Sequence, residues 1–136
     1  MDLDKKLIIT VHDSDPRNTT DTGSQEEILT QLVGTCESLG ETKPELMTSD
    51  FQAKNSAVQI TTEIISGLTI PVVATSAGLV IKHAAPLIAA YLENRPQKEI
   101  VVDYKGHRLT VKGGGNVLAE LNRLKKEIDE EESKNS

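Results

Sequence analysis

The chain has 136 residues, of which 37% are hydrophobic, 26% are charged and 2% are aromatic, and its formal net charge is −6. This length favours one domain that buries a core without disulfides or metal ions. The single cysteine excludes a disulfide framework and is typical of a reducing compartment, so we expect a cytoplasmic protein. No basic stretch precedes an apolar run at the N-terminus, so we expect no signal peptide. The acidic balance and the scarcity of aromatic residues argue against nucleic acid as a partner.

Charge is distributed unevenly along the chain. Residues 1–63 carry 5 basic and 12 acidic side chains, residues 64–119 carry 6 basic and 3 acidic, and residues 120–136 carry 4 basic and 6 acidic. An acidic front, a mildly basic middle and an acidic end can orient a protein partner or a second copy of the chain. A solvated surface without a special role explains the same pattern, so both interpretations stay open.

The first predicted elements are a strand and a helix. Apolar residues alternate from Lys6 to Val11, which predicts a strand. After a loop rich in Asp, Asn and Thr, Ser24 and Glu27 have the spacing of a capping box and predict a helix start. Apolar residues then recur at helical spacing, and Gly40 is the expected residue just beyond the helix end. Cys36 falls on the apolar stripe, so we expect it in the core.

The middle of the chain predicts a weak strand and two apolar helices. A short strand is expected around Glu45–Thr48, because a strand–helix start usually returns to the same sheet. The segments Ala57–Leu68 and Ser76–Leu92 each carry an apolar stripe of helical spacing. Pro86 is expected to kink the second helix or to remove one of its hydrogen bonds.

The segment from Glu99 to Lys112 gives the clearest local signal. Two alternating runs flank the pair Lys105-Gly106, which predicts a hairpin with a two-residue turn. One register gathers the apolar residues on one face and the charged residues on the other, and a one-residue slip would destroy this sorting. The pairs expected on the wet face are Glu99–Lys112, Val101–Thr110 and Asp103–Arg108.

The chain is expected to end in an amphipathic helix. Gly113–Gly115 predicts a flexible connector, and Asn116 is a good N-cap for the helix that follows. Four acidic residues from Asp129 to Glu132 would lie at the helix C-terminus, where the dipole disfavours them. We therefore predict one domain over residues 1–128 and an acidic, disordered tail over 129–136. The predicted fold class is α+β in two layers. A small sheet of the N-terminal strand and the C-terminal hairpin is covered by the apolar helical pair and the amphipathic helices.

No pattern predicts a catalytic, cofactor or metal site. The three histidines, His12, His83 and His107, have no partner at metal-ligand spacing on a helix face. The loop around His12–Asp15 and the Gly113–Gly115 step leave a small hydrolase or a nucleotide-binding domain as one hypothesis. No Lys-Ser/Thr pair follows the glycines, so the P-loop pattern fails. We therefore expect a protein that is not an enzyme.

The segment Ile64–Ile81 leaves one ambiguity about membranes. Its 18 residues contain no charge, which meets the lower length for a spanning helix, and the uncharged stretch resumes after Lys82 up to Leu92. Polar and helix-breaking residues dilute the segment, and no aromatic residue marks either end. We favour a buried helical hairpin. The alternative is a membrane-inserted or membrane-permeabilising component that uses Ile64–Leu92.

The order of these segments resembles the effector-associated constant component family of bacterial proteins. The likeness rests on the apolar segment Ser56–Tyr91, the break Glu93-Asn94-Arg95 and the hairpin turn at Gly106, and it covers most of residues 4–128. The resemblance implies a small adaptor that binds variable effectors, such as NTPases or peptidases, in bacterial conflict systems. It implies no catalytic residue.

We therefore expect a non-enzymatic adaptor that binds another protein and that can also form a homo-oligomer. The candidate contact residues are Lys105, Arg108 and Lys112, on the tip and wet face of the hairpin. A second candidate surface is the part of Val72–Leu92 that stays exposed, because exposed apolar patches often mark interaction sites.

Overall fold

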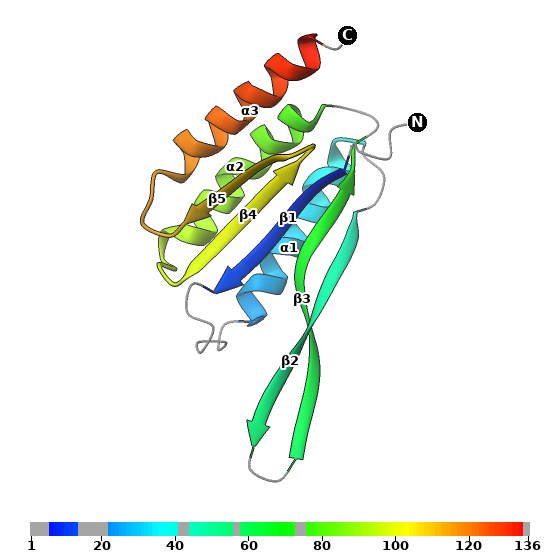
Figure 1. Ribbon diagram of the computed structural model, residues 1–136, viewed down its shortest axis with the longest axis vertical. Coiled ribbons are helices and arrows are strands. Elements are labelled where there is room, and N and C mark those ends of the chain that lie inside the picture. Colours follow the sequence, from blue (N-terminus) through cyan, green and yellow to red (C-terminus); the bar gives the residue numbers. More distant parts are fainter. Residues whose placement is uncertain (1–5, 14–21, 41–43, 56–57, 73–75, 135–136) are drawn as a thin grey trace.

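The computed structural model describes residues 6–13, 22–40, 44–55, 58–72 and 76–134. Five strands form one antiparallel sheet in the order β2-β3-β1-β4-β5, and three helices lie on one face of it (Figure 1). The fold is therefore α+β in two layers, as the sequence predicts. The elements are β1 (Lys6–Asp13), α1 (Thr22–Ser38), β2 (Glu45–Asn55), β3 (Val58–Pro71), α2 (Ala77–Glu93), β4 (Lys98–Tyr104), β5 (His107–Lys112) and α3 (Val117–Lys134).

The first six elements follow the β-α-β-β-α-β order of the ferredoxin-like motif. Helix α1 leads from β1 to β2, and β3 returns between these two strands, so β1 lies in the centre of the sheet. Helix α2 then leads to β4 on the other side of β1. The β5 hairpin strand and α3 extend this core, and α3 packs against both α2 and β5.

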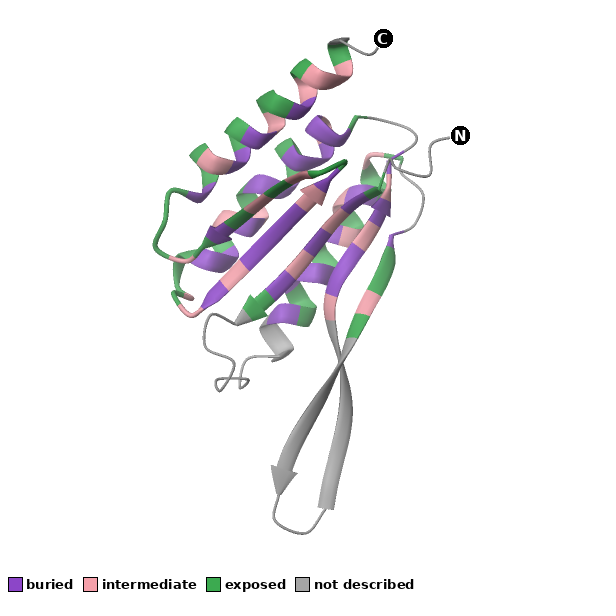
Figure 2. Ribbon diagram, viewed as in Figure 1, coloured by how far each residue is buried: buried purple, intermediate pink, exposed green. Residues whose placement is uncertain are grey.

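The core lies between the sheet and the helices. Alternate residues of each central strand point toward the helices, and Leu7, Ile9 and Ile100 are at most 1% exposed. Figure 2 shows the resulting alternation of buried and less buried residues along β1 and β4. The predicted core position of Cys36 is confirmed. The other strand residues of this apolar core are Val11, Leu68, Ile70, Val102, Tyr104 and Val111.

The hairpin register is confirmed pair by pair, from Glu99–Lys112 to Tyr104–His107. The predicted neighbour relation between the N-terminal strand and this hairpin also holds, because β1 pairs with β4. The face predicted to be exposed to solvent is partly buried, since Val101 is only 7% exposed. Val101 lies between Thr10 on β1 and Thr110 on β5, so it has a neighbouring strand on each side.

The predicted helix over Ala57–Leu68 is wrong, because Val58 to Leu68 lie in strand β3; Ala57 itself lies outside the described residues. Valine, isoleucine and threonine dominate the segment, and β-branched side chains favour the pleated surface of a sheet over a helix. The apolar helical pair is therefore a strand followed by the single helix α2. The uncharged run Ile64–Ile81 is divided between β3 and the start of α2. Within the described residues, no helix has the length and apolar character needed to cross a membrane.

The helix boundaries partly match the predictions. Helix α1 begins at Thr22, so Ser24 lies inside the first turn and is not the N-cap. Gly40 has a φ of +83°, as expected of the residue beyond a helix end. Helix α2 is capped by the Ser76 hydroxyl, which accepts a hydrogen bond from the Leu79 N–H at 3.1 Å. Helix α2 continues through Pro86 to Glu93.

Helix α3 continues through the acidic run to Lys134, whereas the sequence predicts disorder from about residue 129. Lys125 lies one turn before Asp129, and its Nζ donates to Asp129 Oδ2 at 2.6 Å. Glu131 and Glu132 contact residues of the β4–β5 hairpin. These cationic and hydrogen-bonding partners offset the unfavourable interaction of the acids with the helix dipole.

Strand β2 is much longer than the short strand predicted around Glu45–Thr48. Its register with β3 shifts between Met47 and Thr48, so Ser66 is an extra residue on β3, and its hydroxyl donates to the Met47 carbonyl oxygen at 3.4 Å. Such a β-bulge increases the local twist of a strand pair. Beyond the bulge the paired strands continue as a twisted ribbon that projects past the rest of the sheet (Figure 1).

Candidate interaction surface

The three predicted contact residues lie on the β4–β5 hairpin, and all three are exposed. Lys105 and Gly106 form the turn with φ values of +49° and +85°, as a two-residue turn with the twist of a hairpin requires. The Lys105 ammonium lies 5.7 Å from the centre of the Tyr104 ring. Arg108 and Lys112 follow on β5.

The three residues do not form one compact basic patch. Arg108 is directly opposite Asp103, and Lys112 is directly opposite Glu99. Lys105 lies in the turn before β5 and Lys112 at the far end of the strand, which separates them by roughly 20 Å at about 3.3 Å per residue. The hairpin therefore presents alternating charges along an edge of the sheet, and each of the two strand cations has an acidic neighbour.

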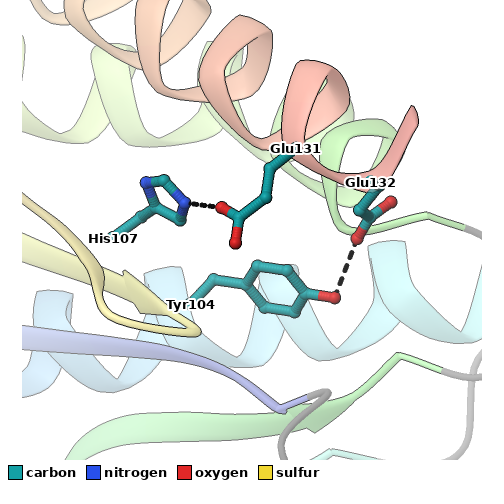
Figure 3. A network of polar contacts seen from close by, with 4 residues as sticks. All are labelled: Tyr104, His107, Glu131 and Glu132. Carbon is teal, nitrogen blue, oxygen red and sulfur yellow. Dashed lines mark hydrogen bonds and ion pairs between the residues drawn. The ribbon is translucent and has the colours of Figure 1, made fainter. Parts of the chain in front are cut away.

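A second feature, missed from the sequence, fastens the hairpin to the end of α3 (Figure 3). The Tyr104 hydroxyl donates to Glu132 Oε1 at 2.8 Å, and the ring is 2% exposed. Beside it, the His107 ring nitrogen Nε2 pairs with Glu131 Oε2. The sequence does place Tyr104 opposite His107 on the helix side of the hairpin. It gives no indication of which acidic residues would reach them.

The face of the sheet opposite the helices is covered by none of the described elements (Figure 1). Thr10 on β1 is opposite Gly67 on β3 and Val101 on β4, and Val101 is in turn opposite Thr110 on β5. The centre of this face therefore carries small and β-branched residues. We call it the open sheet face and define it by Ile8, Thr10, Thr69, Val101 and Thr110, with Glu99, Asp103, Arg108 and Lys112 at its rim.

Gly67 lies opposite Thr10, at the point where the pairing of β3 with β1 begins. A Cβ at this position would lie 2.7 Å from the Ile9 carbonyl oxygen and 2.9 Å from Thr10 Cγ2. Real Cβ atoms do not approach other atoms so closely, so β1 and β3 can pack at this distance only with a glycine here.

The exposed part of the predicted apolar surface, Val72–Leu92, lies on α2. Pro86 and Ala90 are exposed, and with Leu118 at the start of α3 they line a groove of about 570 Å³. Leu118 is 47% exposed. A second groove, of about 700 Å³, lies between α2 and α3. Its lining residues are of polar or charged types: Lys82, Asn122, Lys125, Lys126, Asp129, Glu130 and Ser133.

The segments considered for chemistry are not brought together into a site. His12 is exposed at the end of β1, with its Nε2 3.1 Å from Thr10 Oγ1, while Asp15 lies outside the described residues. Gly113 begins the predicted flexible connector, and its N–H donates to the Lys98 carbonyl oxygen at 3.2 Å. Among the residues with described positions, no three His, Cys, Asp or Glu side chains are grouped so that they could hold a metal ion.

Lys98 is a buried charge that the sequence analysis missed. It is 1% exposed, and its Nζ donates to Gln25 Oε1 at 3.4 Å in the first turns of α1. The alternation of β4 contained the signal, because Lys98 has the same parity as Ile100 and Val102, which point into the core. Its position under α1 makes it a structural residue of the helix–sheet interface.

Comparisons with known proteins give little further information. No family model and no curated protein sequence matches the chain. Among solved structures, the chain is similar to a phage SAM lyase in complex with S-methyl-5′-thioadenosine. The TM-score is 0.42, the identity is 8%, and the alignment covers 80% of this chain and 90% of that chain. At this TM-score the likeness carries no argument about what this chain does.

Proposed function

We propose that this chain is a non-enzymatic adaptor that binds effector proteins, such as NTPases or peptidases, of a bacterial conflict system in the cytoplasm. The observation that carries the proposal is the open sheet face, which the three helices leave uncovered on the described part of the chain. Small molecules are usually bound in concave sites, whereas a broad shallow face with a polar rim fits the surface of another protein.

The charges of the hairpin support a protein partner of mixed charge. Arg108 and Lys112 alternate with Asp103 and Glu99 along the rim of the open sheet face. Rim charges of this kind mainly steer association and fix the register of a complex, while the threonine-rich, β-branched centre of the face supplies the contact area. Lys105 extends this rim at the tip of the hairpin.

The polar groups gathered in Figure 3 also fit a role without catalysis. Tyr104 and Glu132 are hydrogen-bonded to each other, and His107 pairs with Glu131. A catalytic acid or base must reach a substrate atom, whereas Tyr104 is 2% exposed and both pairs bridge the interface between the hairpin and α3. Their arrangement supports a fastening role.

Binding of the proteins encoded beside this chain tests the proposal. The association rate and affinity of each such protein are measured for the wild-type chain and for a triple variant with Lys105→Ala, Arg108→Ala and Lys112→Ala. The matched control removes two lysines and one arginine that are exposed on the helical layer, with Lys82→Ala, Arg123→Ala and Lys126→Ala. We expect slower association only for the hairpin triple. Equal loss in both triples, or no binding together with turnover of a small substrate, would contradict the proposal.

A further inference from the structure

The open sheet face presents its side chains in rows that cross the strands. Directly opposite residues of antiparallel strands point to the same side of a sheet, so the pairs of neighbouring strands join into rows. The first row, from β2 to β5, consists of Glu45, Thr69, Ile8, Asp103 and Arg108. The middle row consists of Met47, Gly67, Thr10, Val101 and Thr110. The described part of the third row consists of His12, Glu99 and Lys112.

The two ends of the first row carry opposite charges. Glu45 on β2 and Arg108 on β5 are both exposed. Strands β2 and β5 each lie two strands away from β1, on either side of it. Each charge is therefore about 10 Å from β1, at about 4.8 Å per strand. Because the acid and the base are equally far from β1, the row is complementary to a copy of itself turned by half a turn about this strand.

We propose that the open sheet face packs against the same face of a second copy of this chain, about a two-fold axis that runs along β1. A two-fold interface uses the same patch on both chains, so each contact between two different residues occurs twice. This axis places Arg108 over Glu45 of the second copy, which gives two ion pairs. It also places Asp103 over the neutral Thr69.

The centre of the face fits the same axis. Val101 lies over Gly67 of the second copy, and the glycine adds no side chain to the contact. Ile8, Thr10 and His12 lie on β1 and meet their own counterparts. Sheets that pack face to face are turned by about 30° relative to each other. At about 10 Å from the axis this rotation displaces a residue by about 5 Å, which long arginine and glutamate side chains can cover.

Other arrangements of two copies set charges in unfavourable positions. An axis that crosses the strands at the middle row places Asp103 over Glu99 and Arg108 over Lys112. An axis between β1 and β3 places Asp103 over Glu45, and an axis between β1 and β4 places the same aspartate over an isoleucine. Like charges across an interface and a charge buried without a partner are both unfavourable. The charges therefore select the axis along β1.

A dimer of this kind regulates access to the open sheet face. The face is about 19 Å wide, at about 4.8 Å for each step between its five strands, so the interface belongs to the small class that dissociates readily. The inference rests on the proposed function in one respect, because effector and second copy then compete for one face. The apparent affinity for an effector should fall as the chain concentration rises above the dissociation constant of the dimer.

Charge reversal tests the axis, with dimer dissociation measured by sedimentation equilibrium on the full chain up to about 0.5 mM. Arg108→Glu and Glu45→Arg each place like charges together twice, and each should raise the dissociation constant about tenfold. The double variant restores opposite charges and should recover most of the wild-type affinity. Recovery also excludes a folding defect as the cause, because both substitutions are still present. Arg123→Glu and Glu26→Arg, exposed on the helical layer, are the matched controls and should leave dissociation unchanged.

Cross-linking gives a second, independent readout of the axis. The two copies of Thr10 meet at the axis, and packed sheets lie about 10 Å apart, which is too far for a direct disulfide. A thiol cross-linker that spans about 8 Å should therefore join two chains that carry Thr10→Cys. Thr110→Cys is the matched control on the same face, because its two copies lie about 19 Å apart and should not be joined. The native Cys36 is buried and should not react.

The outcomes separate this inference from the adaptor proposal. A wild-type chain that stays a monomer, a double charge variant that fails to recover, or equal effects in the helical-layer controls would overturn the dimer. A monomer that still binds an effector overturns the dimer and leaves the adaptor proposal intact. A dimer that binds no effector supports the packing of the two faces and contradicts the adaptor proposal. An effector that binds without dissociating the dimer would overturn the competition for one face.

Discussion

The close backbone approach at Gly113 gives a prediction whose size follows from the structure. A Cβ at Gly113 would collide with the Arg95 carbonyl oxygen and would lie 2.8 Å from both Arg95 C and Pro96 Cα. All three are backbone atoms, so no side chain can swing away. The Gly113 N–H is in addition held by the Lys98 carbonyl oxygen at 3.2 Å. Gly113→Ala must therefore displace the segment that leads from α2 into β4.

The expected cost is about 3 kcal/mol, at the upper end of the range for overpacked sites, because backbone must move. For a chain of this length such a loss lowers the melting temperature by roughly 10 °C. Urea unfolding followed by circular dichroism measures the change directly. The fall should appear in the midpoint of the transition, with an unchanged slope.

Gly34→Ala is the matched control for this experiment. Gly34 is exposed inside α1, and a Cβ there would meet no atom within 4 Å. Alanine is a better helix former than glycine by about 0.5–1 kcal/mol, so this variant should be more stable than the wild type. If Gly113→Ala unfolds at the wild-type urea concentration, the glycine step is the flexible connector that the sequence predicts, and the reasoning from the close approach is refuted.

Three further substitutions test single contacts by the same unfolding assay. Ser76→Ala removes the cap on the Leu79 N–H and should cost about 1 kcal/mol, whereas Ser76→Asn should retain most of the stability. Tyr104→Phe removes the hydrogen bond to Glu132 and should cost about 1.5 kcal/mol, and no loss would show that the end of α3 is not fastened there. Lys98→Ala leaves a cavity and a broken buried contact and should cost about 3 kcal/mol; wild-type stability would mean that Lys98 is solvated.

Elements whose structure is decided by residues close together in the sequence could be predicted. The β4–β5 hairpin follows from its own alternation and its two-residue turn, and every predicted pair is found. Strand β3 was missed because apolar residues four apart, such as Ile60, Ile64 and Leu68, fit both a helix turn and two strand periods. The β-branched composition of the segment contained the deciding signal.

Contacts between distant segments could not be predicted in the same way. The acidic end of α3 is ordered by Tyr104 and His107, which lie on a hairpin more than 20 residues earlier. Similarly, the contact of Lys98 with Gln25 joins residues 73 positions apart. The exposed positions of Lys105 and Arg108 follow from the predicted hairpin register. The same register places Asp103 opposite Arg108, so the basic residues do not form a single patch.

The central claim is that the open sheet face binds a protein partner, and calorimetry with an effector encoded beside this chain tests it most directly. Thr110→Glu places one negative charge on the exposed β5 side of this face, and Gln31→Glu places the same charge on an exposed position of α1. The account predicts at least about a tenfold loss of affinity for Thr110→Glu and the wild-type affinity for Gln31→Glu, with unchanged stability in both. Wild-type affinity in both variants, or an equal loss in both, would contradict the claim.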